Sequence, residues 1–137
     1  MKERFGEEAY QVLVQERSEG IRSQFSKIAA ERGDNSIEAL IKYLCEPMLA
    51  DGLEYTLEQT ESGFQMNCTK CPIYDNAKLH GITEQMFYMV CANDPFMAEG
   101  FNPNIGFKRT KTLMQGDDCC DHFYYYKDKI SKHYDIL

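Results

Sequence analysis

The sequence predicts an α+β fold in which an antiparallel four-stranded sheet, built from two hairpins, packs with about three helices in the order α-α-β-β-α-β-β. Two patterns predict it: apolar residues at helical spacing in the first third, and alternation of apolar and polar residues around glycine-containing turns later on. The composition, 43% hydrophobic and 27% charged, is typical of globular proteins. We expect one domain over residues 1–137, with an N-terminal helical segment at 1–34 and a sheet and site-bearing core at 53–126.

Apolar side chains recurring three and four residues apart predict two helices in the first 50 residues. The first runs from Glu7 to Glu31, and Gly20 could kink or divide it. Residues 35–38, Asn-Ser-Ile-Glu, offer a capping pair ahead of the second helix, IEALIKYLCEPMLA. Within that helix, Pro47 is expected to end or bend it.

The middle of the chain predicts a hairpin followed by a third helix. LEYTLEQT, residues 53–60, alternates apolar and polar side chains, and a glycine-containing turn separates it from FQMNC at 64–68. GITEQMFYMVCAND, residues 81–94, has helical spacing, and we expect Pro95 to close it. Cys91 and Asp94 are three residues apart on this helix, so they share a face.

A second hairpin is predicted from IGFKRTKTLM, residues 105–114, and CCDHFYYY, residues 119–126. Gly116 suits a two-residue turn that needs a positive φ at its first central position. The pairs that follow from this turn are Met114 with Cys119, Leu113 with Cys120, Lys111 with His122 and Arg109 with Tyr124.

Cys120 and His122 are two residues apart on the last strand and therefore share a face. Alternation places Arg109 and Lys111 on the same face and Asp121 on the opposite one. A cysteine needs a base or a positive charge nearby to become a thiolate at neutral pH, which His122 or Lys111 would provide. Two packed side chains with no chemistry would show the same spacing, so both interpretations stay open.

The chain has six cysteines and no secretory signal, which favours reduced thiols and a cytoplasmic protein. Cys68-Thr-Lys-Cys71 forms a Cys-x-x-Cys turn that can supply two corners of a zinc tetrahedron. The other ligands would come from Cys91, Cys120, His122 or His80. Zinc is the one cofactor that the pattern suggests, and a redox dithiol or ordinary free thiols are the alternatives.

Charge and hydropathy limit the partners. A formal net charge of −7 disfavours nucleic acid, because phosphate-binding surfaces need clustered Lys and Arg. No stretch is apolar enough over the length needed to cross a bilayer, so we expect no membrane partner. A small molecule is the expected ligand, and the open edges of a four-stranded sheet would allow a homodimer.

Three runs of sequence, CPIYDNAKLHG, MVCANDPFMAEGFNP and RTKTLMQGDDCCDHFYY, resemble the L-2-amino-thiazoline-4-carboxylic acid hydrolase family. The resemblance covers roughly residues 20–126, and its most specific elements are Cys91 with Asp94, the strand TKTLMQGD, and Cys120-Asp121 beyond the glycine turn. It implies hydrolytic opening of a cyclic amidine: water adds to the carbon between ring sulfur and nitrogen, giving an N-carbamoyl-cysteine.

What the resemblance implies can be stated residue by residue. Cys91, Cys120 and Asp121 match family positions and are the first catalytic candidates, together with Asp94. The reaction needs a cysteine nucleophile or an activated water, an acid for the departing sulfur and a cation for the substrate carboxylate. To these we add His122 as base or acid, and, as the carboxylate anchor, Lys111 or Arg109.

A more distant resemblance supports a different function. A glycine, an acidic residue and a strand beginning with cysteine also end the small-molecule-binding domain related to the bacteriochlorophyll 4-vinyl reductase module. That resemblance implies a non-catalytic binding, sensor or scaffold module, in which zinc could staple the cysteines. The catalytic hypothesis requires Cys91 and Cys120 to converge, with Asp121 or His122 close by.

Overall fold

The computed structural model describes residues 2–129. Four strands form one antiparallel sheet in the spatial order β1-β2-β4-β3. They are β1 (Glu54–Gln59), β2 (Gly63–Lys70), β3 (Ile105–Lys108) and β4 (Cys120–Tyr126). The α-helices of the described residues are α1 (Lys2–Arg32), α2 (Ile37–Leu49), α3 (Pro72–Leu79), α4 (Thr83–Met89) and α5 (Asp94–Phe101). The predicted α+β class and four-stranded antiparallel sheet are confirmed, with five α-helices where about three were predicted.

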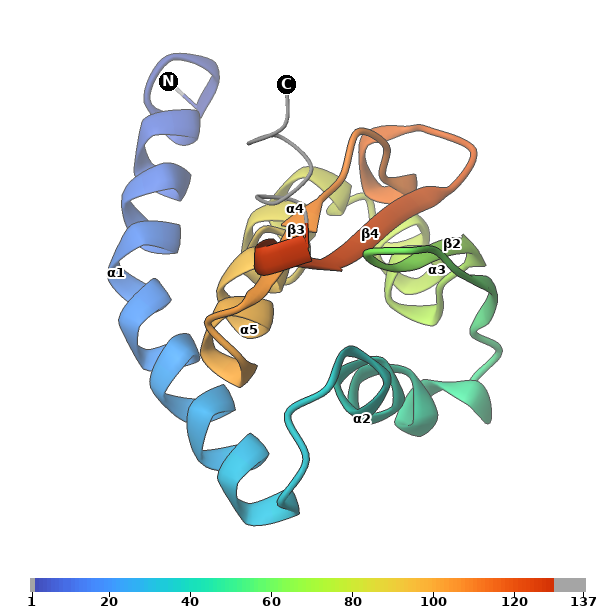
Figure 1. Ribbon diagram of the computed structural model, residues 1–137. Helices are drawn as coiled ribbons and strands as arrows, with labels where there is room; N and C mark the ends of the chain where they lie inside the picture. The colour runs from blue at the N-terminus through green and yellow to red at the C-terminus, as the bar shows by residue number, and fades with distance from the viewer. Residues whose placement is uncertain (1, 130–137) are drawn as a thin grey trace, which may run out of the picture.

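The first helix runs along one side of the molecule without interruption (Figure 1). The prediction that Gly20 could divide it is wrong, and an added Cβ at Gly20 would meet no atom within 4 Å. α1 packs against α5, where a Cβ at Gly100 would lie 2.4 Å from the carbonyl oxygen of Arg22. The two backbones therefore approach closely because residue 100 has no side chain.

The second helix begins as its sequence predicted. Ser36 is the N-cap, and its Oγ accepts a hydrogen bond of 3.2 Å from the backbone N–H of Ala39. Pro47 does not end the helix, which continues to Leu49. Proline has no backbone N–H, so Pro47 costs the helix one hydrogen bond. Only Met48 and Leu49 follow it, so the rest of the helix is unaffected. The apolar face buries Ile37, Leu40, Ile41 and Cys45.

The first hairpin is confirmed, and its second strand pairs with β4 in the centre of the sheet. Cys68 lies opposite Cys120, and Met66 lies opposite His122. In β2 the buried positions alternate with half-exposed ones, as expected for a strand with one face against the core. This pairing places the candidate site residues Cys120 and His122 of β4 beside the end of β2, which carries Cys68.

The segment between β2 and β3 departs most from expectation. Residues 72–79 form α3, which was not predicted, with Pro72 as its first residue and Cys71 as N-cap. The helix predicted over 81–94 is broken: α4 ends at Met89, a 3-10 turn η1 (Cys91–Asn93) follows, and α5 begins at Asp94. Pro95 opens α5 and does not close a helix, because a proline in the first turn loses no intrahelical hydrogen bond.

The strands of the second hairpin are present, but their register differs by two residues from the prediction. Phe107, and not Arg109, lies opposite Tyr124. β3 ends at Lys108, and the following loop contains a 3-10 turn η2 (Leu113–Gln115) in place of the predicted two-residue turn. Gly116 does have a positive φ, of 98°, as C-cap of this turn. Residues two apart on one strand share a face whatever its pairing register, so Cys120, His122 and Tyr124 still face one side.

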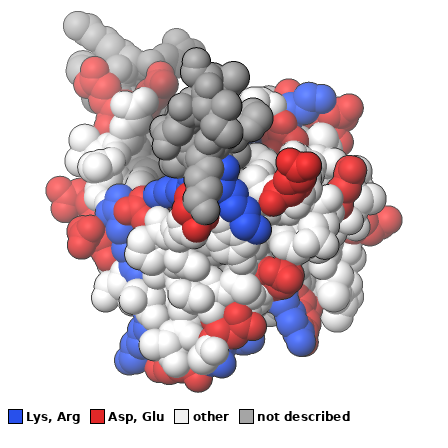
Figure 2. Space-filling model, viewed as in Figure 1, with Lys and Arg blue, Asp and Glu red and all other residues white. Residues whose placement is uncertain are grey.

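On the face shown in Figure 2, Lys and Arg side chains lie among Asp and Glu side chains. The absence of a nucleic-acid partner stays a prediction. In the part of the chain that the structure describes, no helix combines the length and the apolar character needed to cross a membrane.

Candidate active site

A cavity of about 260 Å³ lies between α2, the central strands of the sheet and the start of α5. Its wall is mostly apolar, with leucine, methionine and cysteine side chains predominating. The lining residues are Leu44, Cys45, Met48, Leu53, Met66, Cys68, Cys71, Ile73, Val90, Cys91, Asp94, Met97, Met114, Cys120, His122 and Tyr124. A mostly apolar pocket with a few convergent polar groups is the usual form of a small-molecule site.

The structure brings together residues that are far apart in the sequence. Cys91 comes from η1 and Asp94 from the first turn of α5, whereas Cys120 and His122 come from β4. All four line the cavity. Contact between Cys91 and Cys120, and the catalytic roles of these residues, stay predictions.

Asp94 is the acidic group of the cavity wall. Its carboxylate oxygen Oδ2 is 2.7 Å from Nη1 of Arg109, and the two side chains are only 14% and 11% exposed. The same nitrogen donates a hydrogen bond of 3.1 Å to the backbone oxygen of Cys91. Burial raises the pKa of Asp94 to about 7, although Arg109 opposes the rise. Near neutral pH this group can therefore donate or accept a proton.

His122 lies beside this ion pair. Its Nε2 is 3.8 Å from Oδ2 of Asp94, and its buried Nδ1 has no hydrogen-bond partner within the described chain. Burial lowers the pKa of His122 to about 4, and the charge of Arg109 lowers it further in the same direction. The imidazole is thus neutral at pH 7, with one ring nitrogen left to interact with a ligand.

Cys91 and Cys120, the two cysteines of the family resemblance, do not ionise readily to thiolates. Burial raises the pKa of Cys91 to about 12 and also raises the pKa of Cys120. The Cys120 sulfur accepts a hydrogen bond of 3.3 Å from the backbone N–H of Leu113. Both thiols are therefore protonated at neutral pH, and either one would need a base such as His122 before it could attack.

The thiol with a lowered pKa is Cys71, for which the sequence left open a zinc ligand, part of a redox dithiol or an ordinary free thiol. A hydrogen bond from the Cys68 thiol, and the backbone N–H groups of Ile73 and Tyr74, lower the pKa of Cys71 to about 6. The sulfur closes no capping hydrogen bond of regular geometry. Pro72 at the first helical position was the sequence signal for this helix start.

Three predicted residues lie elsewhere. Asp121 does not line the cavity: its carboxylate accepts hydrogen bonds of 2.8 and 2.6 Å from the backbone N–H groups of Thr110 and Lys111, and one from the Thr110 hydroxyl. Lys111 is exposed, and its ammonium nitrogen lies 3.7 Å from a carboxylate oxygen of Asp118. Arg109 does not line the cavity, but it forms an ion pair with Asp94, which does.

The cavity does not have the geometry of a metal centre. Cys68, Cys71, Cys91 and Cys120 all line it. Within residues 2–129, however, no group of three or more His, Cys, Asp or Glu side chains is arranged so that it could hold a metal ion. His80 is the exposed C-cap of α3. The zinc hypothesis therefore has no support in the arrangement of these side chains.

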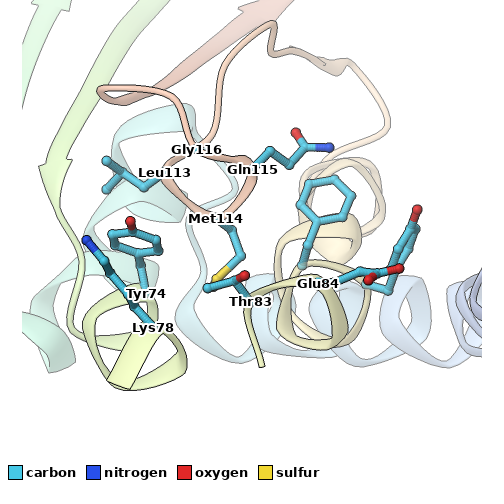
Figure 3. Close-up of a pocket in the computed structure, with 10 residues that line it drawn as sticks. Tyr74, Lys78, Thr83, Glu84, Leu113, Met114, Gln115 and Gly116 are labelled. Carbon is cyan, nitrogen blue, oxygen red and sulfur yellow. The ribbon is translucent and has the colours of Figure 1, made fainter. Parts of the chain in front are cut away.

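A second, more open pocket of about 510 Å³ lies between α3, α4 and η2 (Figure 3). Tyr74 and Lys78 line it from α3, and Thr83 and Glu84 line it from α4. Met114 lines both this pocket and the inner cavity. The η2 turn thus separates the thiol-rich cavity from an outer groove.

A family model described as L-2-amino-thiazoline-4-carboxylic acid hydrolase matches residues 1–124, which include every lining residue of the inner cavity. Neither the curated proteins nor the solved structures contain a match to the chain.

Proposed function

Because the chain belongs to the L-2-amino-thiazoline-4-carboxylic acid hydrolase family, we propose that it hydrolyses a small cyclic amidine that carries a carboxylate. The proposed reaction adds water to the carbon between ring sulfur and ring nitrogen. The carbon–sulfur bond then breaks, and the product is an N-carbamoyl-cysteine with a free thiol. The observation that carries this proposal is the buried Asp94, held in the cavity wall between Arg109 and His122.

The size of the cavity suits such a substrate. Its volume of about 260 Å³ is just below the range of about 300–1,000 Å³ that is usual for drug-sized ligands. A five-membered ring with one amino and one carboxylate substituent is smaller than those ligands. Met48, Met66 and Met97 provide adaptable apolar contacts for the ring.

The cavity contains two groups with suitable proton affinities. His122 is neutral and can take a proton from the attacking water, whereas Asp94, with a pKa near 7, is protonated in part of the population and can give a proton to the departing sulfur. The oxygen and both hydrogens of the water end in the product. The proton taken up by His122 passes to the ring nitrogen, and the hydroxyl proton, released as the carbonyl forms, replaces the one that Asp94 gives to the sulfur. Arg109, which pairs with Asp94, favours a carboxylate in the site once Asp94 is protonated.

The raised pKa values of Cys91 and Cys120 favour activated water over a cysteine nucleophile in this proposal. Both thiols lie in the wall and pack around the substrate. Asp121 holds the loop that carries Arg109 by hydrogen bonds, so its role is to position Arg109 and not to contact the substrate. In this account Lys111 stays at the surface with Asp118.

The test is product formation from L-2-amino-thiazoline-4-carboxylate, followed by mass spectrometry so that the protein's own thiols do not interfere. Wild-type protein and the exposed control variant Glu58→Gln should both form N-carbamoyl-cysteine. Asp94→Asn should be slower by about 10²-fold or more, the usual effect of losing a general acid. If the wild-type protein forms no more product than a buffer blank, the proposed reaction is wrong.

The mostly apolar lining supports a second candidate, a small-molecule-binding module without turnover. Calorimetry separates the two candidates. Binding of the intact thiazoline, recovered unchanged after prolonged incubation, would support the binding module and contradict the hydrolase. For either function we propose a cytoplasmic location, where reducing conditions keep the six cysteines as thiols.

A further inference from the structure

We propose that Cys68 and Cys71 form a thiol–disulfide exchange site, in which Cys71 attacks a low-molecular-weight disulfide and Cys68 completes the exchange. This activity is separate from the proposed hydrolysis and stands without it. It rests on the positions of the two sulfurs at the junction of β2 and α3, and on their different exposure.

The junction holds the two cysteines close together. Cys68 is near the end of β2, and Cys71 is the residue between that strand and the first residue of α3. The Cys68 thiol donates a hydrogen bond of 3.4 Å to the backbone oxygen of Lys70, and it is close enough to the Cys71 sulfur for each to shift the pKa of the other. Both side chains line the inner cavity. Cys68 is only 4% exposed, whereas Cys71 is half-buried, so a reagent reaches Cys71 first.

Local electrostatics distinguish Cys71 from the other five cysteines. The Cys68 thiol, and then the backbone N–H groups of Tyr74 and Ile73, lower the pKa of Cys71 to about 6, although burial opposes the change. The pKa of every other cysteine in the chain is raised: Cys45, Cys68, Cys91, Cys119 and Cys120. Near neutral pH the Cys71 sulfur is therefore the thiolate of the cavity, and thiolates are the attacking species in disulfide exchange.

The exchange has two balanced steps. The Cys71 thiolate attacks one sulfur of a disulfide RSSR, the S–S bond breaks, and one thiolate RS⁻ leaves. Cys68 then loses its proton and attacks the Cys71 sulfur of the mixed disulfide, which expels the second RS⁻. The protein dithiol is oxidised by two electrons to one disulfide, and RSSR is reduced to two thiols RSH that take up two protons.

The first step prepares the second. The largest cause of the raised pKa of Cys68 is its hydrogen bond to Cys71, because that bond needs the proton to stay on Cys68. A mixed disulfide leaves no thiolate at Cys71 to accept this bond. Cys68 then ionises more easily at the moment when it has to attack.

The experiment uses full-length reduced protein, pretreated with a chelator, and oxidised glutathione as the disulfide probe. The wild-type protein should lose two hydrogens without keeping glutathione. Trypsin should then release peptides 43–70 and 71–78 joined by a disulfide, since it cuts between Lys70 and Cys71. A second digestion after Tyr55 and Phe64 separates Cys45 from Cys68 and identifies the sulfur that is linked.

Three variants make the proposal falsifiable. Cys68→Ser should stop at the mixed disulfide and carry one glutathione on Cys71. Cys71→Ser should form neither species at the wild-type rate, with a decrease of about tenfold or more. Cys119→Ser, which removes a half-exposed thiol away from the junction, should behave as wild type. A wild-type link between any other cysteine pair, or glutathione first attached elsewhere than Cys71, would overturn the proposal.

Discussion

The Asp94 carboxylate lies 2.7 Å from the Arg109 guanidinium and 3.8 Å from Nε2 of His122. This contact joins the first turn of α5 to the loop after β3. It also places an acid with a raised pKa next to a base with a lowered pKa in one small cavity. The proposed hydrolysis depends on this pairing of an acid and a base with perturbed pKa values.

The same pair predicts opposite effects of pH on stability. The folded pKa of Asp94, about 7, is above its unfolded value, so folded protein binds more protons and the free energy of unfolding falls as pH rises from about 4 to 7. The folded pKa of His122, about 4, is below its unfolded value, so the free energy of unfolding rises between about pH 4 and 6.5. The two effects are on the order of 4 and 3 kcal/mol, respectively, and because they have opposite signs they largely offset each other in wild type.

Single variants should separate the two effects when the free energy of unfolding is measured by urea denaturation at a series of pH values. Relative to wild type, Asp94→Asn should gain stability as pH rises from 4 to 6.5, because only His122 then titrates. His122→Gln should lose stability over the same range. Parallel pH dependence of wild type and both variants would contradict the assigned proton affinities.

Gly100 and Gly20 form a matched pair for the packing of α1 on α5. Gly100→Ala should lower the free energy of unfolding by about 1–3 kcal/mol, because its Cβ would overlap the backbone of Arg22. Gly20→Ala adds the same methyl group to open space on α1 and should raise stability by up to about 1 kcal/mol through helix propensity. Thermal or urea unfolding measures both. Equal effects at the two positions would show that α5 does not approach α1 as described.

Asp121 should act by fixing the loop that carries Arg109. Burial works against its ionisation, but hydrogen bonds from Thr110 and Lys111 together hold the pKa of Asp121 below its usual value. Asp121→Asn weakens these bonds, so hydrogen exchange of residues 109–112 should become faster. The matched control is Asp118→Asn, whose side chain is 84% exposed, and it should leave exchange there unchanged. Unchanged protection in Asp121→Asn would rule out this positioning role.

The cysteines should differ in their reaction with iodoacetamide. Between pH 5 and 8, labelling of Cys71 should rise with a midpoint near pH 6, whereas Cys91, with a pKa of about 12, should stay nearly unlabelled. Peptide mass spectrometry gives the rate at each site, with Cys71→Ser as control. A thiol at Cys91 or Cys120 that reacts ahead of Cys71 would instead favour covalent catalysis by that cysteine.

Local sequence patterns were sufficient to predict the longer elements, in which a regular side-chain spacing repeats several times. α1, α2 and the first hairpin follow from side-chain spacing, and alternation on β4 placed Cys120 with His122 and apart from Asp121. The short elements were harder. α3 has eight residues, too few for a clear period, and Pro95 fits a helix start as well as a helix end. The cavity lining from α2 and α5 depends on packing that no local pattern shows.

The register of β3 illustrates why the rest could not be predicted. The sequence around Gly116 is typical of a tight hairpin turn. In the structure, however, the Asp121 side chain accepts hydrogen bonds from the backbone N–H groups of Thr110 and Lys111. Those side-chain contacts replace regular strand pairing beyond Lys108 and leave room for η2. The lowered pKa of Cys71 likewise depends on the position of Cys68 and on helix α3, so spacing alone could not assign it.

The most direct test of the account is the pH dependence of kcat/KM for L-2-amino-thiazoline-4-carboxylate, with the substrate's own titration measured separately. If Asp94 is the proton donor, kcat/KM should fall as pH rises through about 7, because the group loses its proton there. The fall should be absent from any residual activity of Asp94→Asn. A kcat/KM that stays constant from pH 6 to 8, or a fall that persists in that variant, would contradict the assignment of Asp94 as the acid.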